Sequence, residues 1–345
     1  MKTKSILLFA LCTLHFSFFI SPSFAQNTWT NLNPTLNAGN RDSHNMVWDT
    51  ESQRAILYGG HYGGNPIPYS ETWAYDYSAN TWTNMSPAIN PGNRAEYGMC
   101  YMPQHDRVIL YGGGTDNNTW SYDFNTNTWT NLNPAQNPGS LGIVTRMAYD
   151  AESDRIILYN HNADETWAYD YVANTWQNMN PPLPRPASNW QFFSAIEYDS
   201  SHDRIVIATP AQQTWEYSYN TNTWQQRVAA PNVLLSGGGI YDMDYDAAND
   251  KMILYGDNQI TWAYDYNSDS WTNMNASPNP TAHHHAICYM PQFCKMLFYG
   301  GYNYTWEYAY ATCLTGISSE QDKEDFDIEI YPRSEERRVG KECRL

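Results

Sequence analysis

The 345-residue chain has few basic residues and few long apolar segments. Lys and Arg together number 19 against 36 Asp and Glu, so the formal net charge is −17 at pH 7. Such a chain has no positive surface for a nucleic acid or an anionic membrane, and we expect neither as a partner. Only residues 6–20 form a long apolar run, and no later segment is apolar enough for membrane insertion.

Several short motifs that carry chemistry are also missing. The chain has no Cys-x-x-Cys, no His-Glu-x-x-His, no phosphate-binding glycine loop and no Ser-rich Asp-box. No motif therefore identifies a catalytic centre, and the sequence favours a protein without a cofactor or metal.

Aromatic residues are abundant instead, with 28 Tyr and 14 Trp, and they can supply a core at a mean hydropathy of only −0.64. Many belong to the sequence TWAYDY and its variants, which recur at spacings of 44 to 48 residues. A repeat of this period indicates a solenoid or a propeller. The six copies are residues 72–77, 119–124, 166–171, 214–219, 261–266 and 305–310.

Each repeat contains four short β-type runs separated by turn residues. The last run of the first five repeats carries a tryptophan nine residues after the TWAYDY tryptophan, whereas the sixth repeat lacks it. The chain instead begins with an isolated copy of this run, residues 27–32, containing Trp29. We therefore predict that this N-terminal strand completes the sixth blade and closes the ring.

The repeats share a pattern with a known family. A Gly-Gly pair ends the second strand, Tyr-Asp lies inside the third, and a Trp follows, as at Gly59-Gly60, Gly112-Gly113 and, for the Gly pair, Gly300-Gly301. This pattern resembles the kelch repeat, which also builds the central domain of galactose oxidase. The resemblance spans residues 27–310 and implies an all-β, six-bladed kelch-type β-propeller with four-stranded blades. We assign it to residues 26–316 and expect a monomer.

Both ends of the chain resemble export signals. Residues 1–25 carry two lysines, an apolar run and a small-residue cleavage site, as secretory signal peptides do. Residues 317–332 read as an acidic linker, and FDIEIYP at 326–332 resembles the start of a type IX secretion sorting domain. Residues 333–345 resemble a translated sequencing adapter, and we exclude them from the fold. The protein is thus expected to be secreted or on the outer surface of a Gram-negative bacterium.

The positions of the cysteines suggest one disulfide bond. An exported chain can keep disulfides, and the last hairpin would bring Cys294 opposite Cys313, so we predict a bridge between them. Cys100 and Cys288 occupy matching places in two non-adjacent repeats. We predict that these two are buried thiols.

Long connections on one face of a propeller carry its binding surface. Aromatic side chains there can stack on sugars, and arginines can bind carboxylates. The predicted ligand-binding residues are Arg41, His44, Tyr62, Arg94, Tyr97, Trp190, Tyr241 and His285.

Alignment of the first strands places one residue of each blade at the channel mouth, and the six are His44, Tyr97, Thr145, Ser194, Tyr241 and His285. Two His and two Tyr near a propeller axis are similar to the copper site of galactose oxidase, whose propeller has seven blades. The alternative is a set of hydrogen-bonded side chains lining a wet channel.

A second candidate cluster is acidic. Asp242, Asp244 and Asp246 alternate along the fifth first strand, and Glu197 matches Asp244 in the preceding blade. Paired carboxyl groups can act as general acid and base. The alternative is a salt-bridged set with Arg146, which lies level with Asp242, or turn chemistry at Asp246.

Taken together, the sequence favours a non-catalytic module that binds a glycan or a protein on its loop face. The alternative is a carbohydrate-active enzyme, either a galactose-oxidase-like copper oxidase or an isomerase similar to the six-bladed sialic-acid mutarotase.

Overall fold

A computed structural model describes residues 27–62, 69–113, 117–139, 146–160, 163–186, 194–209, 211–231, 242–256, 258–281, 285–300 and 303–310. These residues all belong to one compact unit that ends at Thr312. They form 24 strands in six sheets. Within these ranges, no helix has the length and apolarity needed to cross a membrane. The predicted signal peptide, acidic linker and adapter-like tail lie outside the described residues.

The first three sheets each consist of four consecutive strands. Blade 1 contains β2 (Asn45–Asp49), β3 (Arg54–Tyr58), β4 (Thr72–Asp76) and β5 (Thr81–Asn84). Blade 2 contains β6 (Gly98–Met102), β7 (Arg107–Tyr111), β8 (Thr119–Asp123) and β9 (Thr128–Asn131). Blade 3 contains β10 (Arg146–Asp150), β11 (Arg155–Asn160), β12 (Glu165–Asp170) and β13 (Thr175–Asn178).

The last three sheets follow the same order, except that the sixth borrows a strand from the start of the chain. Blade 4 contains β14 (Ala195–Asp199), β15 (Arg204–Ala208), β16 (Thr214–Ser218) and β17 (Thr223–Gln226). Blade 5 contains β18 (Asp242–Asp246), β19 (Lys251–Tyr255), β20 (Thr261–Asp265) and β21 (Ser270–Asn273). Blade 6 contains β22 (His285–Met290), β23 (Lys295–Gly300), β24 (Tyr304–Ala309) and β1 (Thr28–Asn31).

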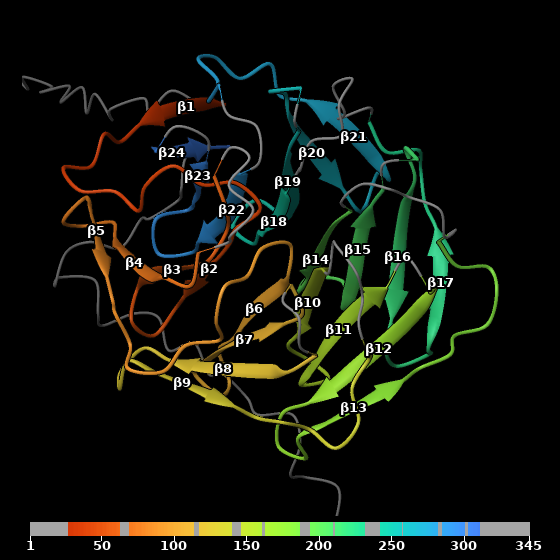
Figure 1. Cartoon of the computed structure of the whole chain (residues 1–345). Coiled ribbons are helices and arrows are strands. Elements are labelled where there is room, and N and C mark those ends of the chain that lie inside the picture. Colours follow the sequence, from red (N-terminus) through yellow and green to blue (C-terminus); the bar gives the residue numbers. More distant parts are fainter. Residues whose placement is uncertain are drawn as a thin grey trace, which may run out of the picture. The chain divides into compact units, whose positions relative to one another are not determined.

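The six sheets are arranged as the blades of a propeller (Figure 1). All neighbouring strands are antiparallel, and the first strands β2, β6, β10, β14, β18 and β22 contact one another in a closed ring. The N-terminal strand β1 pairs with β24, with Trp29 opposite Tyr308. This confirms the predicted six-bladed, four-stranded propeller and its closure by the N-terminal strand.

The second strand of each blade is apolar along its length because other blades cover both of its faces. In β7 every residue after Arg107 is fully buried. Tyr111 packs against Trp176 of blade 3 in a tilted arrangement, with 5.1 Å between ring centroids. Aromatic rings thus fill the space between blades that aliphatic residues fill in most cores.

One contact explains why each repeat needs both its threonine and its last tryptophan. The indole N–H of the outermost strand donates to the hydroxyl of the threonine that begins TWAYDY in the preceding blade, at 2.8–3.0 Å. The bond occurs at all six blade junctions. The pairs are Trp82–Thr305, Trp129–Thr72, Trp176–Thr119, Trp224–Thr166, Trp271–Thr214 and Trp29–Thr261.

The rest of the motif serves the turn that follows it. In blade 2, the Tyr122 hydroxyl donates to Asn127, and the Asn127 amide donates to the Met85 carbonyl of blade 1. Asn127 has a positive φ of 50°, a conformation that asparagine tolerates better than most residues. Asp123 accepts the Thr126 N–H of the same turn and forms an ion pair with Arg107.

The Gly-Gly pairs are required by close backbone approach. A Cβ on Gly60 would lie 2.7 Å from the Asp42 carbonyl oxygen, and one on Gly113 would lie 2.5 Å from that of Ala95. Both glycines also have positive φ, at 87° and 71°. No side chain fits these positions without displacing the neighbouring connection.

Deletion of residues 26–32 is expected to lower the melting temperature by many degrees. The deletion removes β1 and its fully buried Trp29, and it leaves the edge of β24 unpaired. Loss of a buried Trp side chain alone costs about 3–5 kcal/mol. Thermal unfolding followed by circular dichroism measures the effect, and an unchanged melt would refute the role of β1 in closure.

Thr119→Val is expected to destabilise the protein by about 1–3 kcal/mol, because it leaves the buried Trp176 N–H without its acceptor at nearly constant volume. Thr130→Val, at an exposed position of β9, is the matched control and should change stability by less than about 0.5 kcal/mol. Urea unfolding measures both. Equal stabilities of the two variants would contradict the importance of the interblade bond.

Candidate functional site

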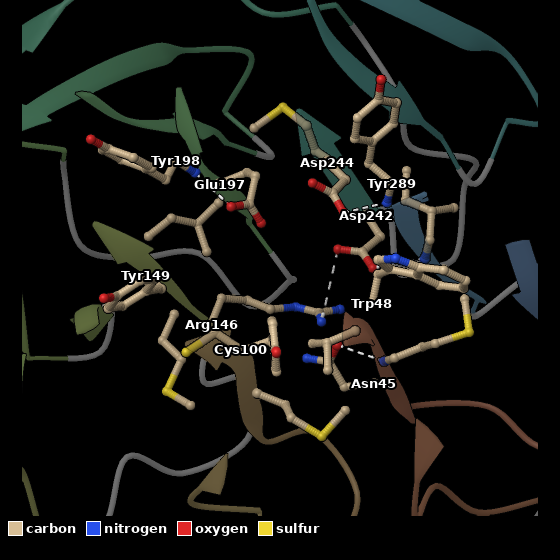
Figure 2. Close-up of a pocket in the computed structure, with 18 of the residues that line it drawn as sticks. Asn45, Trp48, Cys100, Arg146, Tyr149, Glu197, Tyr198, Asp242, Asp244 and Tyr289 are labelled. Carbon is tan, nitrogen blue, oxygen red and sulfur yellow. Dashed lines mark hydrogen bonds and ion pairs between the residues drawn. The ribbon is translucent and has the colours of Figure 1, made fainter. Parts of the chain in front are cut away.

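A cavity of about 250 Å³ lies among the first strands of all six blades. Figure 2 shows a close-up of this cavity with residues that line it drawn as sticks. The polar and charged side chains that line it include Asn45, Arg146, Glu197, Asp242 and Asp244, which come from four different blades. Concave sites with a few convergent polar groups are the usual place for a small ligand.

Strand alternation places the charged residues of this cavity on one face of the inner strands. Side chains at the first and third positions of a strand point to the same face, and in β18 two of them, Asp242 and Asp244, reach β22 of the next blade. The first positions, by their shared register, are Asn45, Gly98, Arg146, Ala195, Asp242 and Ala286. The third positions are Val47, Cys100, Ala148, Glu197, Asp244 and Cys288. Charge is therefore confined to blades 3, 4 and 5.

Arg146 and Asp242 interact across the cavity. The guanidinium Nη1 lies 4.0 Å from Asp242 Oδ1, and both side chains are nearly buried. Figure 2 shows Arg146 reaching from its own blade past blade 4 toward Asp242. This contact corresponds to the salt-bridged alternative for the acidic cluster.

Asp242 and Asp244 of β18 also bind the neighbouring blade. Asp242 Oδ2 accepts the Ile287 N–H at 3.1 Å, and Asp244 Oδ2 accepts the Tyr289 N–H at 2.7 Å. Inner strands have no sheet partner on the channel side, so these carboxyl groups satisfy N–H groups of β22 that would otherwise lack a partner. Glu197 is different, because its one direct hydrogen bond within the described residues is to the N–H of the next residue, Tyr198, at 2.7 Å.

Burial and neighbouring carboxyl groups raise the pKa values of Glu197 and Asp244. Burial raises the pKa of Glu197 well above its usual value, and the neighbouring Asp244 raises it further. Burial likewise raises the pKa of Asp244, to about 7. Burial raises the pKa of Asp242 too, but Arg146 opposes that shift. At neutral pH the site therefore combines a protonated carboxyl group, a carboxylate and a guanidinium, which together donate and accept hydrogen bonds.

The predicted loop-face arginines are part of the fold. Arg41 and Arg94 are almost fully buried, and they donate to the carbonyls of Gly59 and Gly112 at 2.9 and 2.7 Å. Arg41 also pairs with Glu71 at 3.0 Å. These guanidinium groups hold the connections between blades, and their burial leaves little of them for a ligand.

The ring of residues at the channel mouth forms another set of interblade bonds. His44, Tyr97 and His285 occupy equivalent positions and each donates to a backbone carbonyl of the preceding blade. The acceptors are the carbonyls of Tyr299, Tyr58 and Tyr255, respectively. Burial and nearby Arg41 hold the pKa of His44 well below its usual value, so the His44 imidazole is neutral. The outcome corresponds to the hydrogen-bonded alternative for this ring.

The remaining predicted residues are not brought together by the described structure. Tyr62 is 42% exposed at the surface. Trp190 and Tyr241 lie outside the described residues. The structure thus brings the acidic cluster together with Arg146. The other described candidates bind backbone carbonyls at blade junctions, and these are Arg41, His44, Arg94, Tyr97 and His285.

The cysteines fall into two groups. Cys100 and Cys288 are buried free thiols, as predicted. Burial raises the pKa of both, so both are protonated. Cys294 is disulfide-bonded. Cys313 lies outside the described residues, so the Cys294–Cys313 pairing stays a prediction.

Some residues of the site were missed by sequence reasoning. Asn45 lies level with Arg146 and Asp242, and its backbone N–H donates to the Tyr97 hydroxyl at 3.0 Å. Its side chain lines the cavity. A comparison of first-position residues between repeats would have found it, because Asn45 is polar where blades 2, 4 and 6 have Gly or Ala.

Glu197→Gln is expected to flatten the dependence of stability on pH. A carboxyl group with a raised folded-state pKa stabilises the protein at low pH and loses that contribution as the pH rises through the folded-state value. The wild type should therefore lose stability between about pH 4.5 and 7, by up to about 1.4 kcal/mol per pH unit for each such group. Chemical unfolding across this range measures the slope.

The exposed Glu152→Gln is the matched control and should keep the wild-type slope. At pH 8 the Glu197 variant should be more stable than the control, and at pH 4 the two should be alike. Parallel slopes for both variants would show that Glu197 is not perturbed by burial in the cavity.

Comparison with known proteins adds no family assignment. No protein-family model matches the chain, and no curated protein matches it. The kelch identity of the repeats therefore stays a prediction, whereas the six four-stranded blades identify the chain as a six-bladed β-propeller.

Proposed function

We propose that the protein is a non-catalytic binding module that holds a hydroxyl-rich end of a glycan in the cavity on its axis. The observation that carries this proposal is the meeting of Glu197, Asp244, Asp242 and Arg146 in a cavity of about 250 Å³. Ligand pockets commonly measure about 300–1,000 Å³. This cavity therefore suits one small unit, such as a terminal monosaccharide, better than a peptide segment.

The charges of the cavity favour a neutral ligand. The carboxyl groups of Glu197, Asp242 and Asp244 line the cavity with one guanidinium, that of Arg146. The whole chain carries a net charge of −17. An anionic ligand would meet an excess of negative charge. Sugar hydroxyl groups both donate and accept, so they complement a mixture of carboxylate, protonated carboxyl and guanidinium groups.

Within this proposal, Glu197 makes the main directional contact. Within the described residues its carboxyl group accepts one hydrogen bond, from the next N–H of its own strand, whereas Asp242 and Asp244 also accept N–H groups of β22. Arg146 pairs with Asp242 and lines the cavity, where a guanidinium can donate to a sugar oxygen. Met46 and Met243 supply apolar walls next to these groups.

The setting of this binding function is also proposed. The signal-peptide pattern of residues 1–25 and the sorting-like residues 326–332 support action outside the cell or on its surface. The Gly-Gly, Tyr-Asp and Trp pattern supports kelch-type repeats, which mostly act as binding scaffolds.

A second candidate is sugar isomerisation, favoured by the raised pKa values of Glu197 and Asp244. Two adjacent carboxyl groups that titrate near neutrality can act as general acid and base. In mutarotation, the acid would protonate the ring oxygen while the base removes the anomeric hydroxyl proton, and the reverse transfers would close the ring again. The copper-oxidase alternative has less support, because His44 and His285 each use Nε2 for a backbone carbonyl.

Glu197→Gln is expected to weaken binding of the best ligand from a glycan array by about tenfold or more. Removal of one partner of a buried hydrogen bond costs about 1–3 kcal/mol, and about 1.4 kcal/mol corresponds to a factor of ten in Kd. Isothermal titration calorimetry with the soluble mono- or disaccharide measures it. Glu152→Gln is the control and should bind like the wild type.

Two results would decide between the candidate functions. If NMR of the anomeric protons shows catalysed interconversion that Glu197→Gln abolishes, the isomerase candidate replaces the binding module. If the array and calorimetry detect no saturable sugar binding by the folded wild type, the glycan proposal is wrong.

A further inference from the structure

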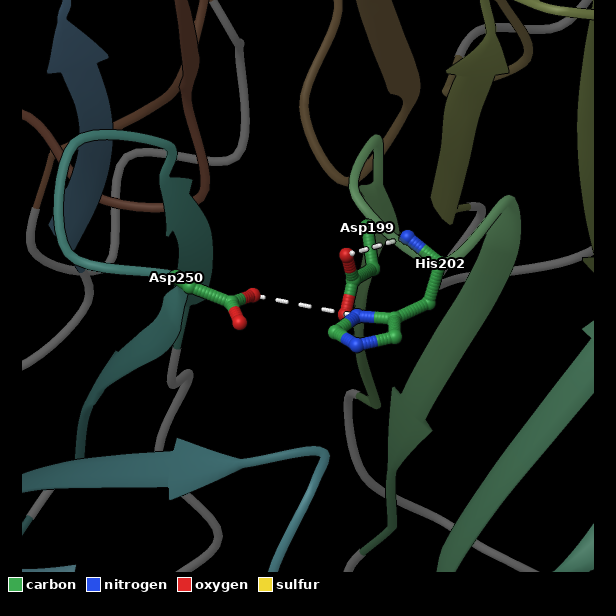
Figure 3. A group of neighbouring side chains, drawn as sticks. All are labelled: Asp199, His202 and Asp250. Carbon is green, nitrogen blue, oxygen red and sulfur yellow. Dashed lines mark hydrogen bonds and ion pairs between the residues drawn. The ribbon is translucent and has the colours of Figure 1, made fainter.

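A cluster of Asp199, His202 and Asp250 lies at the end of the inner strands away from the first-position residues of the cavity (Figure 3). Asp199 is the last residue of β14, and His202 lies in the turn that follows. Asp250 lies in the corresponding turn after β18 of blade 5. One potential ligand atom from each of the three side chains lies within 4.8 Å of the other two.

The His202 ring is fixed in position. It stacks on Tyr266 of blade 5 at a centroid distance of 4.1 Å and an angle of 25°. Nε2 lies 3.2 Å from Asn267 Oδ1. The Asn267 amide nitrogen donates to Asp250 Oδ2 at 3.0 Å, which directs the amide oxygen toward the imidazole. Nε2 therefore carries the proton that this contact requires.

A neutral ring with the proton on Nε2 presents a bare lone pair at Nδ1. That lone pair faces two carboxylates, at 2.9 Å from Asp199 Oδ2 and 3.7 Å from Asp250 Oδ1. Three lone-pair donors that converge without a positive charge repel one another. A cation must balance them, and it is either a second proton on the ring or a metal ion.

No basic side chain supplies that balance. In the described part of the chain, no lysine or arginine forms an ion pair with Asp199 or Asp250. The adjacent Lys251 is directed to Asp265, at 3.1 Å, and to the backbone carbonyl of Asp250. The two carboxylates thus bring a charge of −2 to a single imidazole.

We propose that Asp199, His202 and Asp250 bind one divalent transition-metal ion of the zinc class between blades 4 and 5. One imidazole and two carboxylates are a ligand set that Zn²⁺ accepts, with bonds of about 2.0–2.2 Å. A histidine ligand normally donates its other ring N–H to an oxygen, as Nε2 does to Asn267. Asp250 is the most exposed of the three, and its Oδ1 lies 3.7 Å from the same Nδ1.

Each carboxylate directs one oxygen at the cluster, and Asp250 Oδ1 also accepts the Tyr245 hydroxyl at 2.8 Å. Asp199 Oδ1 already accepts the N–H groups of Ser201 and His202, which leaves Oδ2 directed at the cluster. Three protein ligands leave a fourth position open, so a water or an external ligand can join the ion. The inference does not rest on the proposed glycan binding.

The chain contains a natural control for this site. His105 occupies the place of His202 in blade 2, and its Nε2 lies 2.8 Å from Asp154 of blade 3. Where blade 4 has Asp199, blade 2 has Met102, the last residue of β6. The His105 pair therefore lacks the third ligand and is expected to remain a simple ion pair.

The test uses the full chain without a histidine tag, stripped of metal with EDTA and titrated with ZnCl2 in a calorimeter. We expect one tight equivalent of Zn²⁺ that raises the melting temperature. His202→Gln and Asp199→Asn should each weaken this binding at least about tenfold, whereas His105→Gln should leave it unchanged. Co²⁺ should give visible absorption bands of a four- or five-coordinate site in the wild type and in His105→Gln, but not in His202→Gln.

Two outcomes would overturn the proposal. One is the absence of saturable Zn²⁺ binding by the folded wild type, which would assign the charge at His202 to a second proton. The other is equal Zn²⁺ affinity in wild type and His202→Gln, which would locate the ion elsewhere. If His202→Gln fails to fold, Asp250→Asn at the partly exposed turn gives the same comparison.

Discussion

The bond between an indole N–H and a threonine hydroxyl at every blade junction is the contact on which the propeller depends. It joins the outermost strand of one blade to the third strand of the blade before it, and both groups are buried at every junction except that of Trp271, which is partly buried. A buried N–H without a partner costs more than the bond itself contributes, so the contact selects one relative position of neighbouring blades. Hydrophobic packing between sheets has no such direction.

The same junctions explain how much of the fold could be predicted from the sequence. The six TWAYDY copies set the number of blades, and the isolated Trp29 showed how the ring closes. These features are predictable because each blade must satisfy the same contacts with its neighbours. Asn127 and Asp123 of the motif likewise serve a turn and an ion pair that recur in other blades, although blades 4 and 6 have Ser218 and Ala309 in place of the aspartate.

The candidate site was predictable only in part, because it depends on differences between blades. Alignment of the first strands alone placed Arg146 at the same level as Asp242, and Glu197 at the same level as Asp244. The loop-face residues did not behave as the sequence suggested, since Arg41 and His44 look equally suited to a ligand and to a backbone carbonyl. Which acceptor lies within reach depends on the path of the connections, and residue type carries no information about that path.

The inner strands also show why polar side chains can be buried near the propeller axis. A strand with no sheet neighbour on one side has N–H groups without a backbone acceptor. The carboxyl groups of Asp242 and Asp244 accept hydrogen bonds from two of them. This arrangement makes the acidic residues partly structural. It also keeps Glu197, which bonds only its own strand among the described residues, as the group with most freedom to meet a ligand.

The pairing of β1 with β24 gives the molecule a single seam. Every other blade is built from consecutive strands, whereas the sixth joins segments separated by more than 270 residues. The entropy of closing so long a loop must be overcome before this pairing forms. Until then, the edge of β24 can accept the first strand of another copy as readily as its own. The seam is thus the place where two chains would exchange strands, and where a propeller that folds at high concentration would form swapped dimers.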